Sequence, residues 1–210
     1  MEFVPLLDYV CTFVFAVSGA LAAVEKRMDL GGALLLAFLT GTGGGTLRDL
    51  ILDREVFWLA SQTPIYLCAL AAVVTFYATR SVGRLTRAII WIDAVGLALF
   101  CTAGASIALG VGAHPVVCVL MGACSATGGG ILREVVRNEI PIVLQRDIYI
   151  TAALAGATAL VLLVNAGLDV RIASAAGAAI AFALRAAGIV FDLSLPVARG
   201  PDPETTTPAD

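Results

Sequence analysis

Charged residues are scarce in this chain. Only 14% of its 210 residues are Asp, Glu, Lys or Arg, whereas a soluble domain usually carries about 25%. Hydrophobic residues make up 60% of the sequence and the mean hydropathy is +0.95. Because so few charges cannot cover a surface that faces water, we expect lipid to be the solvent for most of the molecule.

Residues that bind metals or act as nucleophiles are also rare. His114 is the single histidine, and its neighbour Pro115 favours a turn there. A structural zinc site needs about four closely spaced Cys or His ligands. No cysteine pair has CxxC spacing, and all five lie in apolar runs, which predicts simple packing: Cys11, Cys68, Cys101, Cys118 and Cys124. We therefore expect no metal, no cofactor and no enzymatic activity. The basic residues form no stripe and the net charge is -3, which argues against a nucleic-acid partner.

Long apolar runs dominate the rest of the sequence. A transmembrane helix needs roughly 20 mainly apolar residues. Seven segments qualify, and turn-forming or charged residues separate them: 4–24, 33–52, 61–79, 88–110, 115–136, 147–165 and 172–190. The tail 192–210, rich in Pro, Thr and acid, is expected to be disordered. The sequence thus predicts an all-α integral membrane protein with seven transmembrane helices.

The basic residues of the loops predict the orientation. Loops on one face hold eight of them (Lys26, Arg27, Arg80, Arg84, Arg87, Arg137, Arg146 and Arg199), and loops on the other hold Arg54 and Arg171. Cytoplasmic loops carry the excess of Lys and Arg. We therefore expect a multi-pass plasma-membrane protein with its N-terminus outside and its C-terminus in the cytoplasm.

The two halves of the sequence resemble one another. Adding 85 to a residue number carries Asp8 onto Asp93, Gly43–Gly45 onto Gly128–Gly130, and Arg48 onto Arg133. Each copy holds three apolar segments, an odd number, so the second copy must be inverted in the bilayer relative to the first. The predicted units are a first three-helix repeat (1–87), a second, inverted repeat (88–166), a seventh helix (167–191) and the tail.

Both glycine triplets fall in the middle of an apolar segment. A glycine costs a helix about 1 kcal/mol relative to alanine, so three in succession predict a broken or kinked helix. The six residues are Gly43, Gly44, Gly45, Gly128, Gly129 and Gly130. The alternative is close packing, because small residues let transmembrane helices approach. A phosphate-binding loop is disfavoured because its lysine is missing.

Charges follow each triplet by one helical turn. Arg48-Asp49 and Arg133-Glu134 would lie within the hydrocarbon slab, where an exposed charge costs at least about 2.5–3.5 kcal/mol. They predict either a polar constriction in a water-filled path or a structural ion-pair network, with crosswise pairs Arg48–Glu134 and Arg133–Asp49. Further residues could line such a path: Asp8, Ser18, Thr42, Asp93 and Thr127. Both aspartates could instead cap helix dipoles.

The doubled GGG-x-x-R-[DE] motif, on inverted three-helix repeats with a seventh helix, resembles the trimeric intracellular cation channels, in particular their prokaryotic branch. The resemblance implies a homotrimer in a lipid membrane. Each protomer would hold a pore for potassium and other monovalent cations, kinked at the glycines and narrowest at Arg48, Asp49, Arg133 and Glu134. Animal members have a lysine-glutamate pair there that holds a phosphoinositide lipid, whereas this chain has arginine, so the resemblance does not extend to lipid control.

Two other functions remain open from the sequence. The same family has been described as a glycine transporter, and arginines at a helix break could bind the carboxylate of a small zwitterion. The charges could also serve only to lock the core of a membrane scaffold that transports nothing.

Overall fold

The computed structural model describes residues 3–78, 85–141, 144 and 148–193, and these residues form helices without any strand. There are eight helices in the described ranges: α1 (Phe3–Glu25), α2 (Leu30–Ile51), α3 (Phe57–Ala60), α4 (Thr63–Ala78), α5 (Leu85–Gly110), α6 (Pro115–Val136), α7 (Ile150–Asn165) and α8 (Val170–Phe191). The arginines at positions 80, 84, 146 and 199, and the tail from residue 194, lie outside the described residues.

Each of the seven predicted apolar segments overlaps one helix. The segment 115–136 coincides with α6, and only the four-residue α3 has no counterpart in the prediction. Five helices are long and apolar enough to cross a membrane, namely α1, α2, α5, α6 and α8. The helices α4 and α7 are apolar but have 16 residues each, fewer than the roughly 20 that a full crossing takes.

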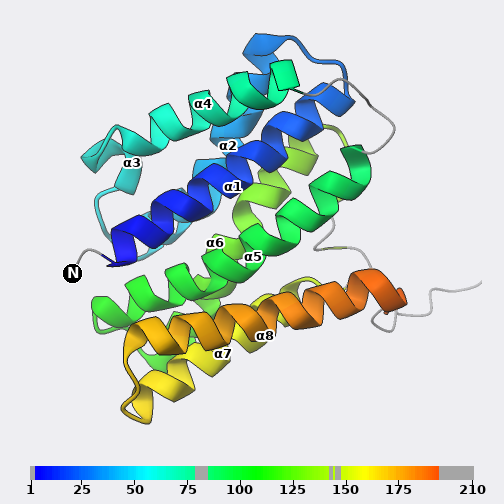
Figure 1. Cartoon of the computed structure of the whole chain (residues 1–210). Helices are drawn as coiled ribbons and strands as arrows, with labels where there is room; N and C mark the ends of the chain where they lie inside the picture. Colours follow the sequence, from blue (N-terminus) through cyan, green and yellow to red (C-terminus); the bar gives the residue numbers. More distant parts are fainter. Residues whose placement is uncertain (1–2, 79–84, 142–143, 145–147, 194–210) are drawn as a thin grey trace, which may run out of the picture.

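The helices pack side by side in one bundle (Figure 1). The helices α1 and α5 run next to each other across its centre, with α2 and α6 packed behind them. At one edge α4 packs against α1 and α2, and at the opposite edge α7 and α8 pack against α5. The four central helices therefore contribute most of the buried polar residues.

The second half reproduces the backbone of the first. The bounds of α2, shifted by 85, are those of α6. Left-handed residues end the helices at matching positions: Arg27 (φ 55°) corresponds to Gly112 (φ 77°), and Asp53 (φ 51°) to Asn138 (φ 57°). At all four ends the residue after the left-handed one donates its backbone N–H five residues back, as in a Schellman motif. The residues that end these four helices therefore share backbone conformation at positions 85 apart.

Matching residues also begin α2 and α6. Asp29 accepts a hydrogen bond from the backbone N–H of Gly32 at 2.7 Å, and His114 accepts one from Val116 through Nδ1 at 3.4 Å. These positions are 85 residues apart. His114 therefore does more than occupy a turn, because it is the N-cap of α6.

The helices continue through both glycine triplets. Residues 43–45 and 128–130 are α-helical, so the expected break in the backbone is wrong, whereas the alternative form, a kink, stays a prediction. A Cβ at Gly44 would overlap the carbonyl oxygen of Ser125, and one at Gly129 would overlap that of Thr40. A Cβ at Gly128 would lie 2.9 Å from Cα of Gly44. The glycines thus bring the backbones of α2 and α6 into direct contact, which is the packing alternative.

Candidate functional site

Arg48 lies at the centre of a buried cluster that joins α1 and α2. Its Nη1 and Nη2 donate to the two carboxylate oxygens of Asp8 at 3.1 and 3.2 Å, and its Nε donates to Asp49 at 2.8 Å. The other oxygen of Asp49 accepts the backbone N–H of Phe57 at 3.0 Å. The Arg48 cluster (Asp8, Arg48 and Asp49) therefore fixes the turn after α2 as well as the guanidinium.

Arg133 forms the matching cluster between α5 and α6. Its Nη1 donates to Asp93 at 2.7 Å and to the hydroxyl of Ser18 at 2.5 Å, while Nη2 donates to Glu134 at 2.7 Å. Two atoms of this Arg133 cluster (Ser18, Asp93, Arg133 and Glu134), Oδ2 of Asp93 and Nε of Arg133, are buried without a hydrogen-bond partner among the described residues. The Arg133 cluster is therefore less completely paired than the Arg48 cluster.

The crosswise pairs expected from the sequence are wrong. Arg48 pairs with Asp8 and Asp49, and Arg133 pairs with Asp93 and Glu134. The crossing of α2 and α6 explains this result. Thr40 meets Gly129 and Gly44 meets Ser125, so the two helices run in opposite directions through the contact. Each arginine lies one turn beyond its triplet, and the two are carried to opposite sides of the crossing.

Both aspartates are partners of arginine and do not act as helix caps. Asp93 lies well inside α5, and Asp8 lies in the second turn of α1. The side chains of Arg48 and Arg133 are each 1% exposed. A buried charge is strongly destabilising unless it is paired and hydrogen-bonded. The two carboxylates around each guanidinium supply that compensation, and they exceed its single positive charge.

The predicted hydroxyl residues divide into two groups. Ser18 contacts the guanidinium of Arg133 directly. Thr42 and Thr127 instead donate to the carbonyl oxygens of Phe38 and Ala123, four residues back on their own helices, at 2.7 and 2.9 Å. Threonine within a helix commonly forms this hydrogen bond to the carbonyl four residues back. Of the three predicted hydroxyl residues, only Ser18 therefore belongs to a charged cluster.

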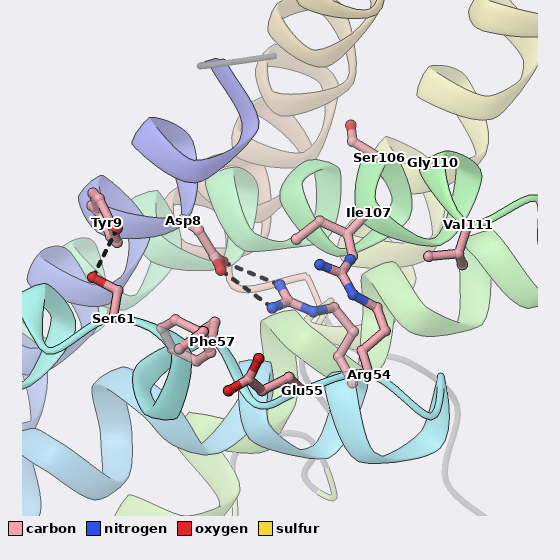
Figure 2. Close-up of a pocket in the computed structure, with 12 residues that line it drawn as sticks. Asp8, Tyr9, Arg54, Glu55, Phe57, Ser61, Ser106, Ile107, Gly110 and Val111 are labelled. Carbon is pink, nitrogen blue, oxygen red and sulfur yellow. Dashed lines mark hydrogen bonds and ion pairs between the residues drawn. The ribbon is translucent and has the colours of Figure 1, made fainter.

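A cavity of about 690 Å³ opens beside the Arg48 cluster (Figure 2). This Asp8 cavity lies between the start of α1, the segment after α2 and the end of α5. Its charged lining residues are Asp8, Arg48, Arg54 and Glu55. The ring of Phe57 also lines it, with Cζ of Arg48 5.7 Å from the ring centroid.

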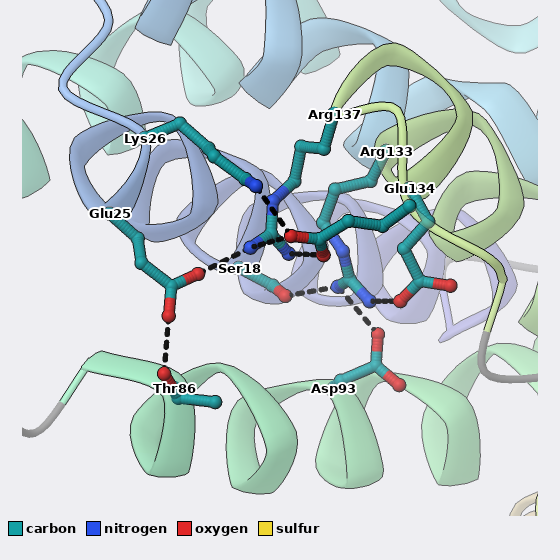
Figure 3. A network of polar contacts seen from close by, with 9 residues as sticks. Ser18, Glu25, Lys26, Thr86, Asp93, Arg133, Glu134 and Arg137 are labelled. Carbon is teal, nitrogen blue, oxygen red and sulfur yellow. Dashed lines mark hydrogen bonds and ion pairs between the residues drawn. The ribbon is translucent and has the colours of Figure 1, made fainter.

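A second cavity, of about 440 Å³, adjoins the Arg133 cluster. This Glu134 cavity lies between the ends of α1 and α6 and the start of α5. A polar network crosses it (Figure 3). Arg137 binds both Glu25 and Glu139, Lys26 binds Glu139 at 2.7 Å, and Thr86 donates to Glu25. The network therefore ties the two halves of the chain together at this mouth.

The cavities lie at opposite ends of α1 and α5. The Asp8 cavity touches residues 8 and 9 of α1 and residues 106, 107 and 110 of α5, whereas the Glu134 cavity touches residue 25 of α1 and residues 86, 89 and 90 of α5. The repeat also relates them, because Glu139 occupies the position of Arg54, and Ile140 that of Glu55. The two cavities thus lie at opposite ends of the central helices, each beside one buried charged cluster.

Sequence reasoning missed several residues of the site. The residues of the polar network were not predicted as site residues: Glu25, Lys26, Thr86 and Arg137. Charged residues at the ends of transmembrane segments are common and do not by themselves indicate a site. The aromatic residues Phe57 and Tyr149 were also missed as neighbours of the clusters. Arg185 could have been found, since an arginine within an apolar segment points to a functional site. It is 2% exposed, with Cζ 5.1 Å from the centroid of the Tyr149 ring.

Three comparisons relate the chain to known proteins. The sequence family described as "Glycine transporter" matches residues 5–80 and 90–165, one stretch in each half. The UPF0126 inner membrane protein YadS of Escherichia coli (strain K12) is 38% identical over 196 residues, which are 90% of this chain and 93% of that protein.

Solved structures are also similar. The TRIC trimeric intracellular cation channel orthologue from Rhodobacter sphaeroides is 46% identical, with a TM-score of 0.86 over 92% of this chain and 100% of that chain. A trimeric intracellular cation channel from C. elegans matches with a TM-score of 0.58 at 16% identity, covering 89% of this chain and 90% of that one, and so shares the fold alone. The chain is therefore an all-helical, multi-pass membrane protein.

Proposed function

The chain belongs to the trimeric intracellular cation channel family, in its prokaryotic branch, and from this premise we propose that it is a passive channel for monovalent cations, chiefly potassium. The proposed path runs from the Asp8 cavity to the Glu134 cavity between α1, α2, α5 and α6. The Arg48 and Arg133 clusters are its narrow section. The observation that carries the proposal is the pair of cavities at opposite ends of α1 and α5, with one buried, repeat-related cluster beside each.

The charges favour a cation in this path. The two clusters hold four carboxylates (Asp8, Asp49, Asp93 and Glu134) against two guanidiniums. At the Glu134 cavity, the charged lining residues are three glutamates (Glu25, Glu134 and Glu139) and one arginine, Arg137. In a low-dielectric channel an excess of negative charge lowers the energy of a passing cation and raises that of an anion.

The buried guanidiniums close the path in this conformation. Since Arg48 and Arg133 are nearly inaccessible, ions would pass only when these side chains leave their carboxylates. The glycine triplets would allow that motion, because backbone atoms of α2 and α6 meet there directly, beside the flexible side chains of Leu47 and Leu132. The glycines would thus act as the pivot of the pore rather than as a fixed break.

The repeat gives this path its symmetry. Both the matching helix ends and the reciprocal contacts Thr40–Gly129 and Gly44–Ser125 support two inverted three-helix units, with α8 as the seventh crossing. The positive-inside bias supports an outer Asp8 cavity, an inner Glu134 cavity and a cytoplasmic C-terminus. A homotrimer, as in the similar solved channels, completes the proposal.

Potassium flux into liposomes tests this function. Pure protein, reconstituted with a potassium gradient, should carry a flux above that of empty vesicles, with no ionophore added. Gly44→Leu, reconstituted at equal density, should insert yet conduct little, because its side chain collides with α6. A wild-type flux no larger than that of empty vesicles would rule out the channel.

A transporter for a small zwitterion such as glycine is the second candidate. The matched family is described as a glycine transporter, and arginine binds carboxylates bidentately. Both guanidiniums already bind carboxylates of the protein, which disfavours this role. Saturable, gradient-coupled uptake of labelled glycine would support the transporter, whereas an ion current that does not saturate would support the channel.

A further inference from the structure

An aromatic ring lies over the third glycine of each triplet. A Cβ at Gly45 would lie 2.7 Å from the ring of Phe57, and a Cβ at Gly130 would lie 3.0 Å from the hydroxyl of Tyr149. Gly45 and Gly130 are equivalent in the repeat, but the two rings come from different segments. Phe57 follows α2, and Tyr149 immediately precedes α7. Both halves thus place a ring beside a buried guanidinium.

The cation that contacts each ring differs between the halves. The guanidinium of Arg48, which belongs to the constriction itself, faces Phe57. Tyr149 is instead faced by Arg185, at 5.1 Å from Cζ to the ring centroid, and Arg185 belongs to α8. Its Nη1 also donates to the carbonyl oxygen of Ile148 at 3.4 Å. The helix outside the repeat therefore holds the segment that carries Tyr149.

The hydroxyl of Tyr149 is part of the surroundings of the Arg133 cluster. From the Cβ position at Gly130, which lies 3.0 Å from the hydroxyl, Oδ1 of Asp93 lies 3.6 Å away and Nη2 of Arg133 lies 3.8 Å away. Tyr149 is 2% exposed, so its ring excludes water from this point. Asp93 and Arg133 each have one atom without a hydrogen-bond partner among the described residues. The position of these two side chains therefore depends on the packing of neighbouring residues such as Tyr149.

We infer that Arg185 is a positioning residue for the constriction at Arg133: it holds the Tyr149 ring against Gly130 and thereby keeps Asp93 and Arg133 together. The described residues of the first half hold no equivalent, because Phe57 is contacted there by the guanidinium of its own cluster. The two constrictions would therefore open with different ease, and α8 would control only the second. The consequence for ion flow rests on the proposed channel function, whereas the structural consequence does not.

Hydrogen exchange tests the structural consequence without any ion flux. In Arg185→Gln, amides of residues 125–136 in α6 should exchange at least about fivefold faster, while the equivalent residues 40–51 in α2 should keep the wild-type rate. Arg171→Gln is the matched control, since it makes the same change at the exposed start of α8. Equal acceleration in both segments, or none in either, would overturn the inference.

Single-channel recording tests the consequence for ion flow. Arg185→Gln should change the open probability at least about threefold, and Arg171→Gln should not. If the wild type conducts and Arg185→Gln gates normally, control by α8 is wrong even though the channel stands. If the wild type conducts nothing, the proposed function fails, and hydrogen exchange still decides whether Arg185 positions the cluster.

Two milder variants keep the inference testable if Arg185→Gln does not fold. Tyr149→Phe retains the ring and its contact with Arg185 but removes the hydroxyl, so it should also accelerate exchange in 125–136 selectively. Arg185→Lys retains a cation at this position, so its amides in 125–136 should recover at least half of the wild-type protection that Arg185→Gln loses. If Arg185→Gln does not fold, the loss in Tyr149→Phe is the reference instead. Wild-type exchange in Tyr149→Phe would show that the hydroxyl does not hold the cluster and would overturn the inference.

Discussion

Nη1 of Arg133 donates to Oδ1 of Asp93 at 2.7 Å, across 40 residues of chain and between two adjacent helices. Arg48 and Asp8 form the same pair at the same separation of 40 residues. Each half of the molecule therefore neutralises its own buried arginine, and neither depends on the other for charge balance. The halves meet along α1 and α5, at the hydroxyl of Ser18 on Arg133, at the glycine contact of α2 with α6 and at the network around Arg137.

Removing one carboxylate from either pair should destabilise the protein. Asp8→Asn leaves Arg48 with Asp49, and Asp93→Asn leaves Arg133 with Glu134 and Ser18. A hydrogen bond to a charged group contributes about 1.5–3 kcal/mol, so we expect each variant to lose about that much. Thermal unfolding in detergent measures the loss. Asp29→Asn is the control, because asparagine caps a helix as well as aspartate, and a loss there equal to those of the other two would contradict the assignment.

The glycine contact should tolerate no side chain at its closest points. Gly44→Ala or Gly129→Ala places a methyl group against a backbone carbonyl of the opposite helix, and overpacking typically costs about 1–3 kcal/mol. The stability against thermal unfolding and the potassium flux should both decrease. Gly31→Ala, also in α2, meets its nearest atom at 3.4 Å and should behave as wild type. Normal flux in both contact variants would remove the glycines from the mechanism.

The mouth at the Glu134 cavity should loosen in acid. The hydrogen bond from Lys26, with the nearby Arg137 and Arg133, lowers the pKa of Glu139. Because this pKa is lower in the folded state, its stabilising effect is present above the unfolded-state pKa and is lost as the pH falls through the lowered value. Thermal unfolding across that range should show the loss. In Lys26→Gln the pH dependence should shrink, and an unchanged profile would contradict the assignment.

Charge at the Asp8 cavity should influence cation entry. Arg54 lines this mouth, so Arg54→Gln removes a positive charge that repels cations. Potassium conductance should rise about twofold at low salt, and the difference should fade at about 1 M salt, where the Debye length is about 3 Å. Arg171 does not line this cavity, so Arg171→Gln serves as the control. Equal conductance for both variants at low salt would show that this cavity is not a mouth of the path.

Much of the fold could be predicted from the sequence. The seven apolar segments became helices because their length and hydropathy suit lipid, and the offset of 85 relates even the helix ends. The charged positions Arg48, Asp49, Arg133 and Glu134 were predicted as either a polar constriction in a water-filled path or a structural ion-pair network, and the structure shows them buried and paired. Charged residues within a membrane need partners and often mark functional sites, so these four residues could be identified as site candidates from the sequence.

The role of the glycine triplets could not be predicted from one helix alone, because it depends on which helix packs against them. A run of three glycines weakens a helix, which predicts a break, but it also removes the atoms that keep two helices apart. Contact with Thr40 and Ser125 across the crossing favoured the second outcome. The rings of Phe57 and Tyr149 were missed for a similar reason, because each reaches its glycine only after the loops fold back.

The sequence by itself determined the helices, the doubled pattern and the burial of two arginines, because hydropathy and spacing act along the chain. Only the tertiary structure decided which carboxylate neutralises which arginine, because that depends on how neighbouring helices pack. The side chains of Asp8 and Asp93 come from α1 and α5, which lie beside the arginines, whereas the antiparallel crossing of α2 and α6 carries Arg48 and Arg133 apart.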